Sequence, residues 1–226
     1  MPKFIFVSGA SGTGKSRIGD ELIAKINQKR LSVSILNLDN YYYGNDIVSK
    51  MAPEDQSNFD RPEALEQSLI IQHLADLNAG KAINRPTYNM ALSDREKETC
   101  PIDSADVIIV EGLFAHLFIN TLPKYQNLSC LIYTESSHIN LNYQRMKERD
   151  IVERQKDEEH IKKMKKNQIG GFFTYIADAK LKADIIIENT YRPSDGKKII
   201  PMIVKDGLKK LEEFLDQPVL SFNLNM

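Results

Sequence analysis

The stretch SGASGTGKS, residues 8–16, matches the pattern G-x-x-x-x-G-K-[ST] from its second residue to its last. An apolar run at residues 4–7 precedes it and predicts a short buried strand, and residues 17–29 follow with apolar side chains at helical spacing. A glycine-rich turn between a strand and a helix points its backbone N–H groups at an anion, at the positive end of the helix. The stretch therefore predicts a binding site for a nucleoside triphosphate rather than a loop that only turns the chain.

Every residue of this phosphate-binding loop is expected to contribute to the nucleotide site, namely Gly9, Ala10, Ser11, Gly12, Thr13, Gly14, Lys15 and Ser16. In such a loop the lysine contacts the β- and γ-phosphates, and the last hydroxyl holds Mg²⁺. We therefore expect Ser16 to be a metal ligand.

Length and composition limit the remaining possibilities. The chain has 226 residues, a length typical of one domain or of one domain with a small lid. Its net charge of −1 lacks the basic footprint of a nucleic-acid-binding protein. No apolar run approaches the ~18 residues that cross a membrane, and the run at the start is too short for a signal peptide. We expect neither a nucleic acid nor a membrane among the partners.

The cysteines and histidines predict no metal site. Cys100 and Cys130 lack the spacing of a metal or redox motif and predict free thiols in a reducing compartment. The four histidines are too scattered along the chain to indicate a shared metal. We therefore expect a cytoplasmic protein.

Strand-like and helical segments alternate, which predicts an α/β fold with a doubly wound, mainly parallel sheet. Further strands are expected within residues 31–40, 105–112, 128–135 and 183–189. Helices are expected near residues 62–78, 113–120, 138–168 and 206–215, with a break at Gly170–Gly171.

Two carboxylates stand at predicted strand ends, where ligands gather in such sheets. Glu111 can hold the Mg²⁺ that Ser16 also contacts, although a partly exposed strand-end acid is the alternative. Asp39 has two interpretations that its spacing does not separate: an Asx-turn, or a general base that deprotonates an acceptor hydroxyl.

Asp60 is better explained by local structure. In DRPE, residues 60–63, an aspartate precedes a proline in the first turn and a glutamate at the third position, which is a variant of the capping box. This pattern predicts a helix N-cap. The lysine-rich stretch at residues 162–166 is similarly expected to be a solvated helix face.

The basic residues near residue 150 have two interpretations. In an unbroken helix Arg145, Arg149 and Lys156 share one stripe, while Arg154 faces away. The stripe can belong to a surface helix, or to a helical lid at about residues 145–170 that carries arginines to the transferring phosphoryl group. Spacing alone does not decide between them.

Several stretches together resemble the uridine kinase family, relatives of phosphoribulokinase and pantothenate kinase. In chain order they are GASGTGKS, LDNYYY, NFDRPEAL, RPTYNM, DVIIVEGLFA, RDIVERQKD and ADIII, spread over about residues 3–190. The resemblance implies a single P-loop kinase domain over residues 1–226 that uses ATP and Mg²⁺. It also implies transfer to the 5′-hydroxyl of uridine or cytidine, often by a homo-oligomer.

The resemblance carries over residue by residue. Asp39 matches the family's catalytic aspartate, and Arg149 and Arg154 match arginines of the lid. The catalytic residues are therefore expected to be Asp39, Lys15, Arg149 and Arg154. The acceptor is expected to contact Tyr42, Phe59, Asp60 and Tyr88. This role for Asp60, on the ribose hydroxyls, would add to or replace its capping role.

The chain departs from the family pattern around the acceptor. Met90 and Ser93 stand where the family has an aromatic residue and a histidine, and Met146 occupies an arginine position. Lys156 replaces the second arginine of the family's ERGR. We therefore expect weak discrimination among bases, or a preference other than plain uridine.

Two other functions remain open. One is a kinase of another hydroxyl metabolite, such as a sugar phosphate or a pantothenate-like compound, although residues 88–93 add no cation for a phosphorylated acceptor. The other is a nucleotide-dependent switch. The chain lacks the Asn-Lys-x-Asp motif of a GTPase and the glycine-rich signature of an ABC-type ATPase.

Overall fold

The computed structural model describes residues 1–51, 57–122, 128–189, 202–203 and 205–218. Its main element is a six-stranded sheet with the strand order β2-β5-β1-β6-β7-β8, in which only β8 is antiparallel to its neighbour. The strands are β1 (Lys3–Gly9), β2 (Val33–Asn37), β5 (Val107–Glu111), β6 (Ser129–Glu135), β7 (Ile185–Glu188) and β8 (Met202–Ile203). The prediction of a mainly parallel sheet is confirmed.

The central strand β1 explains why the sheet is covered on both faces. All of its residues are buried, and its side chains alternate between two separate hydrophobic clusters. Phe4 and Phe6 belong to one cluster, and Ile5 and Val7 belong to the other. A parallel strand buried on both faces reads as a continuous apolar run, which is the pattern that the sequence has here.

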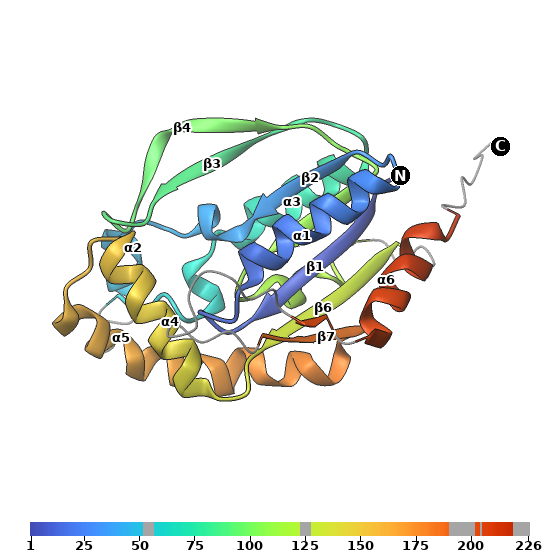
Figure 1. Cartoon of the computed structure of the whole chain (residues 1–226). Helices are drawn as coiled ribbons and strands as arrows, with labels where there is room; N and C mark the ends of the chain where they lie inside the picture. Colours follow the sequence, from blue (N-terminus) through green and yellow to red (C-terminus); the bar gives the residue numbers. More distant parts are fainter. Residues whose placement is uncertain (52–56, 123–127, 190–201, 204, 219–226) are drawn as a thin grey trace.

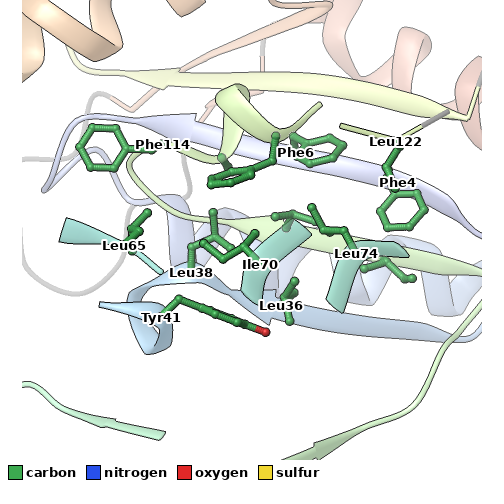
Figure 2. Packing of buried hydrophobic residues seen from close by; sticks show 14 of the residues in the cluster. Phe4, Phe6, Leu36, Leu38, Tyr41, Leu65, Ile70, Leu74, Phe114 and Leu122 are labelled. Carbon is green, nitrogen blue, oxygen red and sulfur yellow. The ribbon is translucent and has the colours of Figure 1, made fainter. Parts of the chain in front are cut away.

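Helices pack on each face. The helices α1 (Lys15–Gln28) and α6 (Lys205–Asp216) contribute to the cluster around Ile5. The cluster around Phe4 contains α3 (Gln67–Asn78) and the turns η4 (Ala115–Phe118) and η6 (Ala177–Lys182). Figure 2 shows this second cluster, with Leu36 and Leu38 beside Ile70 and Leu74 of α3. The prediction of a doubly wound fold is confirmed.

A separate two-stranded hairpin, β3 (Ile83–Asn89) and β4 (Asp94–Ile102), was not predicted. Its pairing is interrupted between Pro86 and Tyr88, and β4 is mostly exposed and charged, so neither strand has the apolar pattern of a buried strand. Figure 1 shows the hairpin running alongside β2 with its turn near α2 (Asn45–Met51). The turn residue Ser93 accepts a hydrogen bond from the Asn45 N–H at 2.9 Å.

The long helix expected at 138–168 is two helices, α4 (Ile139–Val152) and α5 (Glu158–Gly171). The connecting segment, residues 153–157, contains Gln155 with a left-handed backbone φ of 55°. The break expected at Gly170–Gly171 is absent, because α5 continues directly into the π-helical turn η5 (Phe172–Ile176).

Two local expectations are also wrong. Residues 62–64 form only a 3₁₀ turn, η3 (Pro62–Ala64), and α3 begins after Glu66. Arg61, not Asp60, stands at the N-cap position of η3, and no side chain caps that turn. The segment expected to be a helix at 113–120 forms the shorter turn η4. None of the helices in the described ranges combines the length and the apolar character that a bilayer crossing requires.

Candidate active site

A cavity of about 650 Å³ lies at the carboxyl ends of β1, β2 and β5, the edge where α/β sheets bind ligands. Its walls come from the phosphate-binding loop, the segment after β2, the β3–β4 hairpin and the two helices α4 and α5. Most of the predicted site residues line this cavity: Ser11, Gly12, Gly14, Lys15, Ser16, Asp39, Tyr42, Phe59, Asp60, Tyr88, Glu111, Arg149 and Arg154.

The other loop residues, Gly9, Ala10 and Thr13, lie behind this wall and shape the loop. The Thr13 hydroxyl donates to the Ala10 carbonyl at 2.8 Å and lies 2.6 Å from the Thr134 hydroxyl. Gly12 has a φ of 80°, and a Cβ atom there would overlap the Asn142 carbonyl of α4. The loop therefore owes its form to glycine conformations and to close packing against α4.

Lys15 is buried, and its Nζ atom donates to the Ala10 carbonyl at 3.0 Å. Burial lowers the pKa of Lys15, while the carboxylates of Glu111 and Asp39 act in the opposite direction. The lysine is thus held against the loop itself and faces two acids across the cavity.

The Ser16 hydroxyl and Glu111 are brought together as the sequence predicted. Glu111 ends β5 in register with Val7 of β1, and its Oε1 atom lies 3.4 Å from Ser16 Oγ. Burial, and then the neighbouring Asp39 charge, raise the pKa of Glu111.

These oxygen ligands fit Mg²⁺, a hard cation that usually takes one or two protein carboxylates together with substrate phosphates and water. Within the described ranges, no group of three or more His, Cys, Asp or Glu residues could hold a metal ion.

Asp39 lies in the 3₁₀ turn η1 (Leu38–Tyr41) that follows β2. The side chain that caps this turn is Asn37, whose Oδ1 atom accepts the Asp39 N–H at 2.8 Å. In the part of the chain that the structure describes, the Asp39 carboxylate accepts no hydrogen bond. The Asx-turn interpretation of Asp39 is therefore wrong, and the carboxylate lines the cavity.

Three aromatic side chains form one wall of the cavity. The ring centroid of Tyr42 lies 5.7 Å from that of Phe59 and 6.1 Å from that of Tyr88. Beside them Asp60 is buried, and burial, followed by the charge of Asp150, raises its pKa to about 7. The predicted acceptor residues thus occur together, with an apolar wall next to a carboxyl group.

Arg149 and Arg154 converge on one buried carboxylate, Asp150. Arg149 Nε lies 2.8 Å and Arg154 Nη1 lies 3.4 Å from Asp150 Oδ1. The expectation that Arg154 faces away from Arg149 is wrong, because the helix ends at Val152 and both side chains line the cavity.

Two residues that organise the site were not predicted. Asp150 lies between the two arginines in RDIVER, and this position could have indicated that it pairs with them. Arg95 of the hairpin donates to the carbonyl groups of Tyr41 and Tyr42, at 2.7 and 2.8 Å, and pairs with Glu66. Nothing local in the sequence indicates that Arg95 makes these contacts.

A phosphate-binding loop after β1, an acid at the end of β5 and two arginines over the same cavity define a kinase of the P-loop class. The chain belongs to the phosphoribulokinase / uridine kinase family, whose family model matches residues 4–193. The predictions of this family and of a phosphotransferase are confirmed.

Individual relatives agree with this assignment. Uridine-cytidine kinase B of Dictyostelium discoideum is 31% identical over 94% of this chain and 84% of its own length. The uridine kinase of Staphylococcus epidermidis is 34% identical over 81% of this chain and 86% of its own. The structure of phosphoribulokinase from Rhodobacter spheroides superimposes with a TM-score of 0.59 at 15% identity, covering 83% of this chain and 70% of that one. This last similarity concerns the fold.

Proposed function

We propose that the protein transfers the γ-phosphoryl group of ATP to the 5′-hydroxyl of a nucleoside, uridine or cytidine, in the presence of Mg²⁺. The observation that carries the proposal is that Asp39, a carboxylate without a hydrogen bond among the described residues, lines the same cavity as the phosphate-binding loop and the aromatic wall. The relatives named as uridine kinases support the choice of acceptor.

The phosphate half of the reaction depends on positioning and charge. Lys15 and the loop N–H groups hold the β- and γ-phosphates. Ser16 and Glu111 would hold Mg²⁺, which neutralises charge on the phosphates when it is bound. Arg149 and Arg154 add two further positive charges, and phosphoryl transfer needs little more from the protein than such charges held in place.

In the acceptor half, Asp39 accepts the proton of the 5′-hydroxyl as its oxygen attacks the γ-phosphorus and ADP leaves. The Asp60 carboxylate accepts hydrogen bonds from the ribose hydroxyls. The rings of Tyr42, Phe59 and Tyr88 pack against the base, and stacking of this kind tolerates different bases.

We propose further that residues 1–226 act as one domain in which residues 145–170 form a lid. The lid contains the end of α4, the connecting segment 153–157 and most of α5, so it brings both arginines to the cavity. We also propose a cytoplasmic location, which the two free cysteines support, and a homo-oligomer, which the family resemblance supports.

The experiment that tests the function is ADP release from ATP and Mg²⁺ over a panel of nucleosides, sugar phosphates and other hydroxyl metabolites. We expect release that depends on a nucleoside, with kcat/KM values for the different bases within about 200-fold of each other, because apolar contact alone discriminates only this far. ADP release without any acceptor would support a nucleotide-dependent switch. Activity only on a non-nucleoside would mean that the acceptor is another hydroxyl metabolite. Strong selectivity for uridine would contradict only the relaxed base preference.

A further inference from the structure

The lid and the β3–β4 hairpin are joined by one lysine. Lys156 Nζ donates to the Ala91 carbonyl at 2.9 Å and to the Ser93 hydroxyl at 3.0 Å. Ala91 and Ser93 belong to the hairpin turn, and Lys156 belongs to the connecting segment of the lid. Both Lys156 and Ser93 line the cavity.

Both sides of this contact are held by hydrogen bonds of their own. On the lid side, the Lys156 N–H donates to the Asp150 carbonyl at 2.9 Å, after the left-handed residue Gln155. On the hairpin side, Asn89 Oδ1 accepts the N–H groups of Ala91 and Leu92 at 3.1 and 3.0 Å. The lysine therefore meets a turn whose shape is set independently of it.

The chemistry of the contact suits a lysine. An ammonium group is a compact charge with three donors and no acceptor, so it can serve a carbonyl and a hydroxyl together, whereas the planar fork of arginine suits a carboxylate or a phosphate. Lys156 and Ser93 thus form a contact between two side chains that can be replaced separately and together.

We propose that Lys156 is a positioning residue that ties the lid to the hairpin over the acceptor end of the cavity. The hairpin carries Tyr88 of the aromatic wall and Met90, which also lines the cavity, and the same lid carries Arg149 and Arg154. A tie between them couples the binding of the acceptor to the closing of the lid. The proposal rests on the proposed function for the identity of the acceptor, but the tie itself does not.

The kinetic test compares Lys156→Met, Ser93→Ala and the double variant, with Lys162→Met, an exposed lysine of α5, as the matched control. We expect Lys156→Met to raise the acceptor KM about tenfold or more, the usual effect of losing a hydrogen bond to a charged group. The ATP KM should stay within about twofold, and the double variant should be no worse than Lys156→Met, because interacting residues are not additive. Lys156→Arg should restore part of the acceptor KM.

A second measurement does not need turnover. Hydrogen exchange of residues 89–93 and 153–157 should be faster in Lys156→Met than in the wild type or in Lys162→Met, with no substrate present. Unchanged exchange in both segments would overturn the tie, whatever the acceptor is. A rise in the ATP KM with an unchanged acceptor KM would make Lys156 a phosphate contact and also overturn it. If exchange is faster in Lys156→Met but the wild type phosphorylates no nucleoside, the tie stands and the proposed function is removed.

Discussion

The Nη1 atom of Arg154 lies 3.4 Å from the Oδ1 atom of Asp150, a carboxylate whose side chain is only 1% exposed. Arg149 pairs with the same oxygen, so one buried negative charge holds two guanidinium groups. Two positive charges this close repel each other, and the shared carboxylate offsets that repulsion. Since desolvation cancels much of the energy of a buried pair, its main effect is to fix the direction of the arginines.

Replacing this carboxylate should therefore affect catalysis more than folding. We expect Asp150→Asn to lower kcat about 10- to 100-fold, because both arginines lose the charge-assisted contact that orients them. Steady-state kinetics together with circular dichroism would check this. Glu148→Gln, which replaces an exposed acid on the same helix, is the control and should change neither kcat nor the circular dichroism spectrum. Equal effects of the two variants would contradict the orienting role.

Asp39 offers a cleaner separation of catalysis from stability. We expect Asp39→Asn to lower kcat by about 10²-fold or more, the usual contribution of a general base, with little change in the ATP KM. The melting temperature should not fall, since the turn is capped by Asn37 and the substitution removes a charge that raises the pKa of Glu111. Steady-state kinetics and thermal unfolding, measured on the same preparation, test the lower kcat and the unchanged melting temperature. A lower melting temperature with unchanged kcat would make Asp39 a structural residue.

The sheet and the phosphate-binding loop could be predicted because both are local patterns. Apolar runs such as residues 105–112 identify strands buried on two faces, and a motif of fixed spacing defines the loop. The β3–β4 hairpin could not be found in this way. Its second strand is mostly exposed and charged, so it lacks the periodicity on which strand prediction depends.

The remaining errors concern features that only tertiary structure decides. The sequence around Asp60 has the pattern of an N-cap, but an aspartate suits a ligand site as well. Only the folded structure, in which Asp60 is buried near Asp150, separates the two roles. The connection between α4 and α5 turns at Gln155 without a glycine or proline to mark it. The contact between Lys156 and Ser93 joins residues far apart in the chain, which spacing cannot reveal.

Asp60 should also make the stability of the protein depend on pH. Burial raises its pKa from 3.8 to about 7, so between these values the folded state binds more protons than the unfolded state. Stability from this group is therefore present below about pH 4 and is lost as pH rises to about 7, by at most about 1.4 kcal/mol for each pH unit.

The measurement is the free energy of unfolding in urea, for the wild type and for Asp60→Asn, at several values between pH 5 and pH 8. We expect the wild type to lose stability relative to the variant as pH rises through this window. Glu63→Gln, which replaces an exposed acid three residues away, should follow the wild type. Parallel curves for the wild type and Asp60→Asn would mean that Asp60 ionises in the ordinary range.

The two adjacent glycines of α5 allow a matched test of how the lid approaches the acceptor site. A Cβ atom on Gly171 would overlap the carbonyl oxygen of Asp60 and lie 2.9 Å from its Cβ atom, whereas a Cβ atom on Gly170 would meet nothing within 4 Å. Both residues are helical, so alanine should add about 0.5–1 kcal/mol of helix preference at either position. Only the contact with Asp60 differs between them.

We therefore expect Gly170→Ala to raise the melting temperature slightly and to leave the kinetics unchanged. Gly171→Ala should push α5 away from the segment that carries Phe59 and Asp60, because the atoms it meets belong to the backbone and to a short side chain that cannot move aside. The expected result is a lower melting temperature and an acceptor KM raised severalfold, with the ATP KM less affected. Thermal unfolding and acceptor titrations of both variants measure this. If Gly171→Ala gave the same melting temperature and the same acceptor KM as Gly170→Ala, the close approach of α5 to Asp60 would have no part in acceptor binding.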